Sequence, residues 1–119
     1  MPTTFATRKL SNVLPSRTTA RLRAFRRDVE FALPGKVARI VLFGSRARGD
    51  ARHDSDYVAV FVTDLSDRRT IDHALADMAY RHILAGVHIR PVAVPANYLE
   101  SRSGDSLAMN IAQDGILVQ

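Results

Sequence analysis

The sequence predicts a small α/β (α+β) domain in which a mixed sheet of three to four strands is flanked by helices. Two observations predict this fold class. Short apolar runs rich in Val and Ile alternate along the chain with segments that have a helical period, in the order helix, strand, helix, strand, helix, strand. In addition, 119 residues suffice for one hydrophobic core and leave no room for a second. We therefore expect one compact domain, too small for a doubly wound dinucleotide fold.

The first predicted helix follows a lead-in that has no stable period. Residues 1–15 are expected to be flexible or loosely packed, and residues 16–119 to form the single domain. Ser16 can cap a helix that ends at Pro34-Gly35. Its apolar residues fall at spacings of three and four, which predicts one buried face: Leu22, Phe25, Val29 and Leu33.

Three strands are predicted from apolar runs bounded by turn residues. Residues 36–43 lie between Pro-Gly and Gly-Ser, and residues 56–62 are apolar on both faces, as in a covered central strand. In residues 87–94, the two-residue period places His88 and Arg90 on one face. Pro91 predicts that this last strand is an edge strand or contains a bulge.

Helices are predicted between and after these strands. A short helix follows Gly44-Ser45, and a longer one runs from residue 64 or 66 to about residue 84, where His82 packs on the apolar side and Gly86 ends the helix. Two short helices are expected after Pro95, the second between Asp105 and Asp114. The apolar residues 116–118 are expected to dock on the body of the domain.

Composition and charge narrow the classes of function. No apolar run approaches the roughly 20 residues that span a bilayer, so no membrane association is expected. The chain lacks cysteine and a secretory h-region, and we expect a cytoplasmic protein. Its net charge is +5, and seven basic residues precede the first acid, Asp28. This N-terminal region is predicted to be a solvated helix face, with attraction to nucleic acid or nucleotides as the alternative.

The turn after the first strand predicts a phosphate-binding element. Gly44 lets a phosphate approach the backbone, and unpaired N–H groups at the start of a helix would point at it. The Ser45 hydroxyl adds a donor, and Arg46 and Arg48 raise the positive potential. Gly-Ser between a strand and a helix is a weak signal by itself.

A longer pattern identifies a family. Phe-Gly-Ser-Arg-Ala-Arg-Gly at residues 43–49, a polar loop, and Ser55-Asp56-Tyr57 at the start of an apolar strand resemble the minimal nucleotidyltransferase branch of the DNA polymerase beta superfamily. The resemblance implies a polymerase beta palm-like fold and transfer of a nucleoside monophosphate from a nucleoside triphosphate (NTP) to a hydroxyl acceptor. It also implies Mg²⁺, held by two Asp residues at positions i and i+2 of one strand.

In this chain the carboxylate pair is incomplete. Asp56 matches the first position and is the expected catalytic residue and metal ligand, whereas the residue two positions further on is Val58. Two alternatives are open: Val58 replaces the second Asp, or one residue is deleted between Tyr57 and Val58. Asp54 is a further candidate metal ligand. Because the second Asp of the pattern is absent, at most one Mg²⁺ site is expected. Arg90 is predicted to bind a nucleotide phosphate or to pair with Asp56.

Two functions follow from this pattern. The first is nucleotidyl transfer that is weak or lost because the second acid is absent. The second is a non-catalytic nucleotide-binding or partner-binding module, similar to the antitoxin-like members of the family. The resemblance implies a HEPN-type protein as the partner, and a homo-oligomer is the other arrangement that could complete so small an acceptor site.

Overall fold

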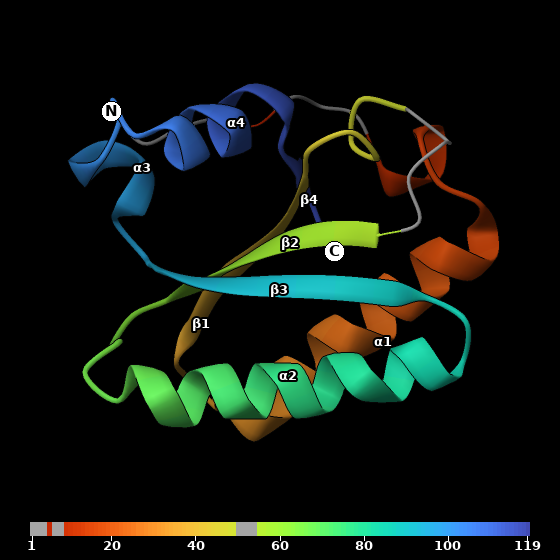
Figure 1. Ribbon diagram of the computed structural model, residues 1–119, viewed down its shortest axis with the longest axis horizontal. Coiled ribbons are helices and arrows are strands. Elements are labelled where there is room, and N and C mark those ends of the chain that lie inside the picture. Colours follow the sequence, from red (N-terminus) through yellow and green to blue (C-terminus); the bar gives the residue numbers. More distant parts are fainter. Residues whose placement is uncertain (1–4, 6–8, 50–54) are drawn as a thin grey trace.

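A four-stranded mixed sheet lies between two layers of helices (Figure 1). The computed structural model describes residues 5, 9–49 and 55–119. The strands lie in the order β3-β2-β1-β4, where β1 is antiparallel to β2 and β4, and β2 is parallel to β3. Their bounds are β1 (Val37–Phe43), β2 (Ser55–Val62), β3 (His88–Pro95) and β4 (Ile116–Leu117). The predicted mixed α/β architecture is confirmed, and the C-terminal apolar tail supplies the fourth strand.

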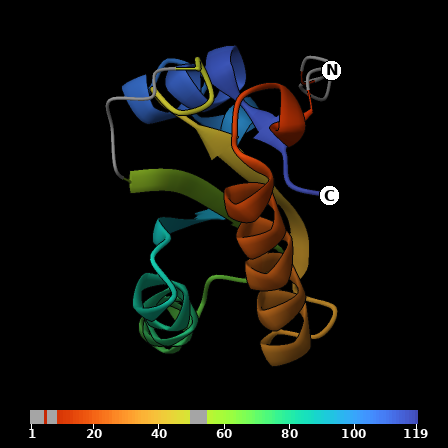
Figure 2. The ribbon, with the colours of Figure 1, turned by 90° about the vertical axis from the view of Figure 1, so that its right-hand side faces the viewer.

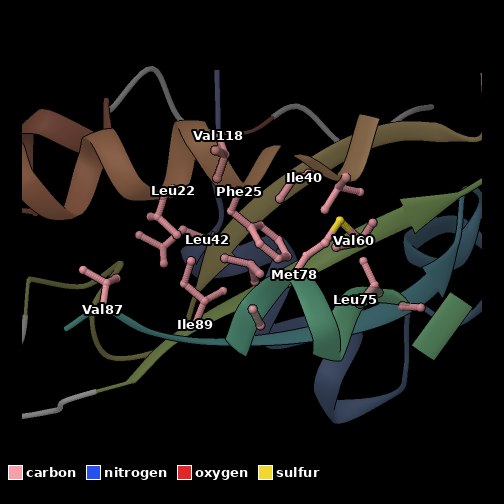
Figure 3. Close-up of a cluster of buried hydrophobic side chains, with 14 of the residues drawn as sticks. Leu22, Phe25, Ile40, Leu42, Val60, Leu75, Met78, Val87, Ile89 and Val118 are labelled. Carbon is pink, nitrogen blue, oxygen red and sulfur yellow. The ribbon is translucent and has the colours of Figure 1, made fainter. Parts of the chain in front are cut away.

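Two long helices cover one face of the sheet, called the α1–α2 face below. They are α1 (Ser16–Ala32) and α2 (Arg68–Leu84), and Figure 2 shows both on the same side of the strands. The predicted stripe of α1 is buried, with Leu22, Phe25 and Val29 fully inaccessible to solvent. Figure 3 shows Leu22 and Phe25 directed from α1 toward α2 and the sheet. Each such side chain contributes about 1.5–3 kcal/mol of hydrophobic stabilisation.

Two short helices cover part of the opposite face, called the α3–α4 face. They are α3 (Tyr98–Ser101) and α4 (Ser106–Asp114), which pack on Val41 of β1, Phe61 of β2 and Val94 of β3. Side chains alternate between the two faces along each strand. Even-numbered residues of β2 therefore point to the α1–α2 face and odd-numbered ones to the α3–α4 face, whereas in β3 this parity is reversed.

β3 is an edge strand, as Pro91 predicts, and its pairing with β2 continues through this proline without a bulge. Ala96 N donates to Val62 O, so even-numbered residues at this end of β3 turn their backbone groups to β2. The backbone of Pro91 therefore faces outward, where its missing N–H breaks no hydrogen bond of the sheet. Arg68 donates to the outward carbonyl of Ala93 at 2.6 Å and helps to close this edge.

The described part of the lead-in packs more closely than expected. A single turn of 3-10 helix, η1 (Leu10–Asn12), precedes α1. Leu10 is 3% exposed and Leu14 is 6% exposed, and both belong to the core on the α1–α2 face. Their spacing of four residues places both on one side of this segment. Among the described helices, none is long and apolar enough to cross a membrane.

Candidate functional site

The turn after β1 differs from the short helix that the sequence predicts. Residues 45–49 form consecutive turns, in which Arg48 N donates to Gly44 O at 3.2 Å and to Ser45 O at 3.1 Å. Gly44 and Gly49 have φ angles of 83° and 86°, a region that favours glycine. The helical conformation therefore ends at Gly49 after one turn. A phosphate at this position would be bound by backbone N–H groups and the Ser45 hydroxyl, without the dipole of a long helix.

A buried ion pair joins this turn to the beginning of β2. Arg46 Nε lies 3.4 Å from Asp56 Oδ1, and the two side chains are 16% and 3% exposed. Burial raises the pKa of the Asp56 carboxyl, while the nearby charges of Arg46 and His88 oppose this shift. Within the described part of the chain, no group donates a hydrogen bond of normal geometry to Asp56 Oδ1, so its stabilisation by Arg46 is mainly electrostatic.

The turn is also anchored to both layers of helices. Ala47 is fully buried in the core of the α1–α2 face. Arg48 Nη1 donates to Asp114 Oδ2 at 2.7 Å, which ties the turn to the last residue of α4. The two arginines predicted to bind phosphate, Arg46 and Arg48, thus each contact a carboxylate. Their direct contact with a phosphate stays a prediction, as it does for Gly44 and Ser45.

Asp56 points to the α1–α2 face, on the same side of β2 as the fully buried Val58. Tyr57 lies on the opposite side of β2, where its ring centroid is 6.1 Å from that of Phe43 and its exposure is 43%. Ser55 shares this side of β2 with Tyr57. The side chain that was the predicted metal ligand is therefore directed into the protein, beside a guanidinium.

The α3–α4 face of β2 and β3 carries a cluster of polar groups at the start of both strands. Arg90 Nε donates to Ser55 Oγ at 3.1 Å, and His88 Nδ1 lies 3.5 Å from the same hydroxyl. The sequence correctly predicts that His88 and Arg90 share a face. The alternative that Arg90 pairs with Asp56 is wrong, because the two side chains lie on opposite faces of the sheet.

Sequence reasoning missed Ser55 and Tyr57 as residues of this face. Residues 58–62 are apolar on both sides of β2. Their pattern therefore does not indicate whether the odd-numbered or the even-numbered residues face α3 and α4. The β3 alternation marks a polar face in the sequence, but the parallel register seen in the structure is needed to pair Ser55 with His88 and Tyr57 with Arg90.

The described residues do not fit a two-magnesium centre. Mg²⁺ prefers carboxylate oxygens with near-octahedral geometry. Here the one carboxylate predicted to bind it is buried beside Arg46, and the side chains of the α3–α4 face at this point are a hydroxyl, a phenol, an imidazole and a guanidinium. Within the described ranges, no group of three or more His, Asp or Glu side chains is arranged to hold a metal. Asp54, the second candidate, lies outside the described residues.

Comparison with known proteins assigns the family. The fold and the glycine turn define a small α/β domain with a candidate phosphate-binding turn at the end of its first strand. The family model described as nucleotidyltransferase domain matches residues 22–118, and the chain belongs to this family. This assignment agrees with the fold predicted from the sequence, and it implies an NTP as the substrate class and Mg²⁺ as the usual metal of the family. A search of curated proteins gives no significant match.

Proposed function

We propose that this chain is a minimal nucleotidyltransferase-like domain that binds a nucleotide and whose nucleotidyl transfer is weak or lost. The orientation of Asp56 carries the proposal. Family catalysis needs two carboxylates at positions i and i+2 on one face of a strand, where they hold Mg²⁺ next to the triphosphate. On the α3–α4 face, those positions of β2 are Ser55 and Tyr57, and Asp56 points away from it.

This orientation favours the deletion alternative over the substitution of Val58. A loss of one residue moves every following side chain to the other face, unless a bulge absorbs the change. The pairing of β2 with β3 runs without interruption from Ser55 to Val62. Its pairing with β1 is regular from Tyr57 to Phe61, and a register shift lies between Val37 and Arg39, at the end of the ladder away from Asp56. We infer that Ser55 and Tyr57 occupy the places of the two family carboxylates.

Binding would then depend on groups that need no metal. The Gly44 backbone and the Ser45 hydroxyl would contact phosphate oxygens, and the Arg46–Asp56 and Arg48–Asp114 pairs would keep the turn in its shape. Arg46 and Arg48 would also contribute positive potential. In the described part of β2 and β3, no carboxylate lies on the α3–α4 face, and the Asp114 carboxylate at the end of α4 is paired with Arg48. This arrangement supports a binding role over transfer.

An assay of pyrophosphate release with ATP and Mg²⁺ tests the proposal. We expect a rate for the wild-type chain that is equal to that of buffer, if transfer is lost, or only slightly above it, if transfer is weak. The double variant Ser55→Asp/Tyr57→Asp should gain Mn²⁺ binding, which electron paramagnetic resonance detects, because it places two carboxylates on one face. Metal-dependent release by the wild type that is abolished by Asp56→Asn would contradict the proposal. The HEPN-type partner and the homo-oligomer stay predictions, as does nucleic-acid binding.

A further inference from the structure

The polar cluster of Ser55, His88 and Arg90 is separate from the turn at Gly44-Ser45. The cluster lies at the start of β2 and β3, whereas the turn follows the end of β1. Neighbouring strands are about 5 Å apart, so the turn and β3 are separated by about 10 Å across the sheet. A polyphosphate chain that begins at the turn could therefore extend over Tyr57 to the cluster.

The chemistry of the cluster is that of an anion site. Arg90 is exposed and uses Nε to reach Ser55, and among the described residues no acceptor contacts its two terminal nitrogens. His88 directs Nδ1 to the same serine, which leaves Nε2 for a ligand. Asp56, whose charge interacts with that of His88, lies on the other face of the sheet and is paired with Arg46. Guanidinium N–H groups fit phosphate oxygens in bidentate geometry.

Ser55 gives this cluster a fixed shape. Its hydroxyl contacts Arg90 Nε at 3.1 Å and His88 Nδ1 at 3.5 Å, so the serine lies between the two nitrogen-containing side chains. An arginine held through Nε has its terminal nitrogens oriented before a ligand arrives, and less rotamer entropy is then lost on binding. Ser55 would thus act as a positioning residue for Arg90.

We propose that Ser55, His88 and Arg90 form a metal-independent site for the terminal phosphate of a nucleoside polyphosphate. This inference deepens the proposed nucleotide binding and rests on it for the identity of the ligand. The positive charge of Arg90 takes the place that Mg²⁺ has in a catalytic nucleotidyltransferase. AMP, whose single phosphate is bound at the turn, would not reach the cluster, whereas ATP would.

Calorimetric titrations in EDTA test this site, with Arg90→Gln as the variant and Arg69→Gln as the control. Arg69 is exposed on α2 and loses the same charge. We expect Arg90→Gln to weaken ATP binding roughly 10- to 100-fold, which is the range for a lost hydrogen bond to a charged group. AMP binding by Arg90→Gln, and ATP binding by Arg69→Gln, should stay within about twofold of the wild type. Ser55→Ala should weaken ATP binding less than Arg90→Gln and leave AMP binding unchanged.

The outcomes separate this inference from the proposed function. If the wild type binds ATP and Arg90→Gln binds it equally well, the cluster is not a phosphate site, although nucleotide binding stands. An equal loss of ATP and AMP affinity would also overturn the inference. If the wild type binds no nucleotide, the proposed function fails. In that case, NMR of the His88 ring signals during a titration with inorganic pyrophosphate still tests the site. Signals that shift in the wild type but not in Arg90→Gln would support it, and unshifted signals in the wild type would exclude it.

Discussion

Arg46 and Asp56 form an ion pair between the glycine turn and the first residues of β2, with Nε and Oδ1 3.4 Å apart and both side chains largely buried. The pair connects the two halves of the family pattern, the predicted phosphate-binding turn and the predicted metal-binding strand. A guanidinium thus lies beside the carboxylate that the sequence assigns to a metal. In this arrangement Asp56 is one of the anchors of the turn, together with the buried Ala47 and the Arg48–Asp114 pair.

Removing the arginine should destabilise the domain strongly. Arg46→Ala leaves the Asp56 carboxylate buried without a counter-charge, and such a loss costs about 3–5 kcal/mol. Urea unfolding at pH 7, followed by circular dichroism, measures the free energy of unfolding. Arg81→Ala on the exposed side of α2 is the matched control and should change it by less than about 0.5 kcal/mol. Similar values for the two variants would show that the pair contributes no stability.

The contribution of Asp56 to the free energy of unfolding should decrease as pH rises, because the pKa of its carboxyl is raised in the folded state. Burial raises the pKa of Asp56 in the folded state, so folded protein binds more protons than unfolded protein between about pH 4 and that raised value. The free energy of unfolding of the wild type, minus that of Asp56→Asn, should therefore fall as pH rises through this window. The comparison uses urea unfolding from pH 3 to pH 7. A difference that grows with pH would indicate a lowered pKa instead.

A new carboxylate should have opposite effects at the neighbouring positions 57 and 58. Val58 is fully buried on the α1–α2 face, and an uncompensated charge there costs several kcal/mol, so Val58→Asp should leave the chain largely unfolded. Tyr57 is 43% exposed, and Tyr57→Asp should cost about 1 kcal/mol. Thermal unfolding compares the two variants. A stable, folded Val58→Asp protein would show that β2 has the opposite orientation.

Gly44 should tolerate asparagine better than alanine. Its φ of 83° is strained for a residue with a Cβ, although apart from its chain neighbours no heavy atom of the described residues lies within 4 Å of the place of that Cβ. Gly44→Ala should therefore cost about 1–2 kcal/mol through the backbone alone, and Gly44→Asn less, because asparagine adopts left-handed conformations more readily. Denaturant unfolding measures both variants. Equal stability of Gly44→Ala and wild type would show that the turn has a different conformation.

Much of the fold was predictable because its signals are local. The period of three and four in α1 identifies its buried residues, and the β3 alternation correctly places His88 and Arg90 on one face. Pro91 identifies an edge strand. The packing of Leu10 and Leu14 was missed because two leucines are too few to establish a period.

The site was harder to predict because its contacts join distant parts of the chain. Arg48 and Asp114 are 66 residues apart in the sequence. Nothing in the sequence around Asp114, the last residue of α4, indicates that its carboxylate pairs with Arg48. The face of Asp56 depends on the register of a strand that is apolar on both sides, so the sequence did not show that this carboxylate points away from Arg90. The prediction of a short helix after Gly44-Ser45 was also wrong, because the chain leaves the helical conformation at Gly49 after one turn.

The most direct test of the account is the effect of Mg²⁺ on nucleotide affinity. Calorimetric titration of the wild-type chain with ATP, once in EDTA and once in excess Mg²⁺, compares the two dissociation constants. With Asp56 directed into the core beside Arg46, we expect the constants to agree within about twofold, or about 0.4 kcal/mol. A Kd that Mg²⁺ lowers by about tenfold or more, with the gain lost in Asp56→Asn, would contradict the account.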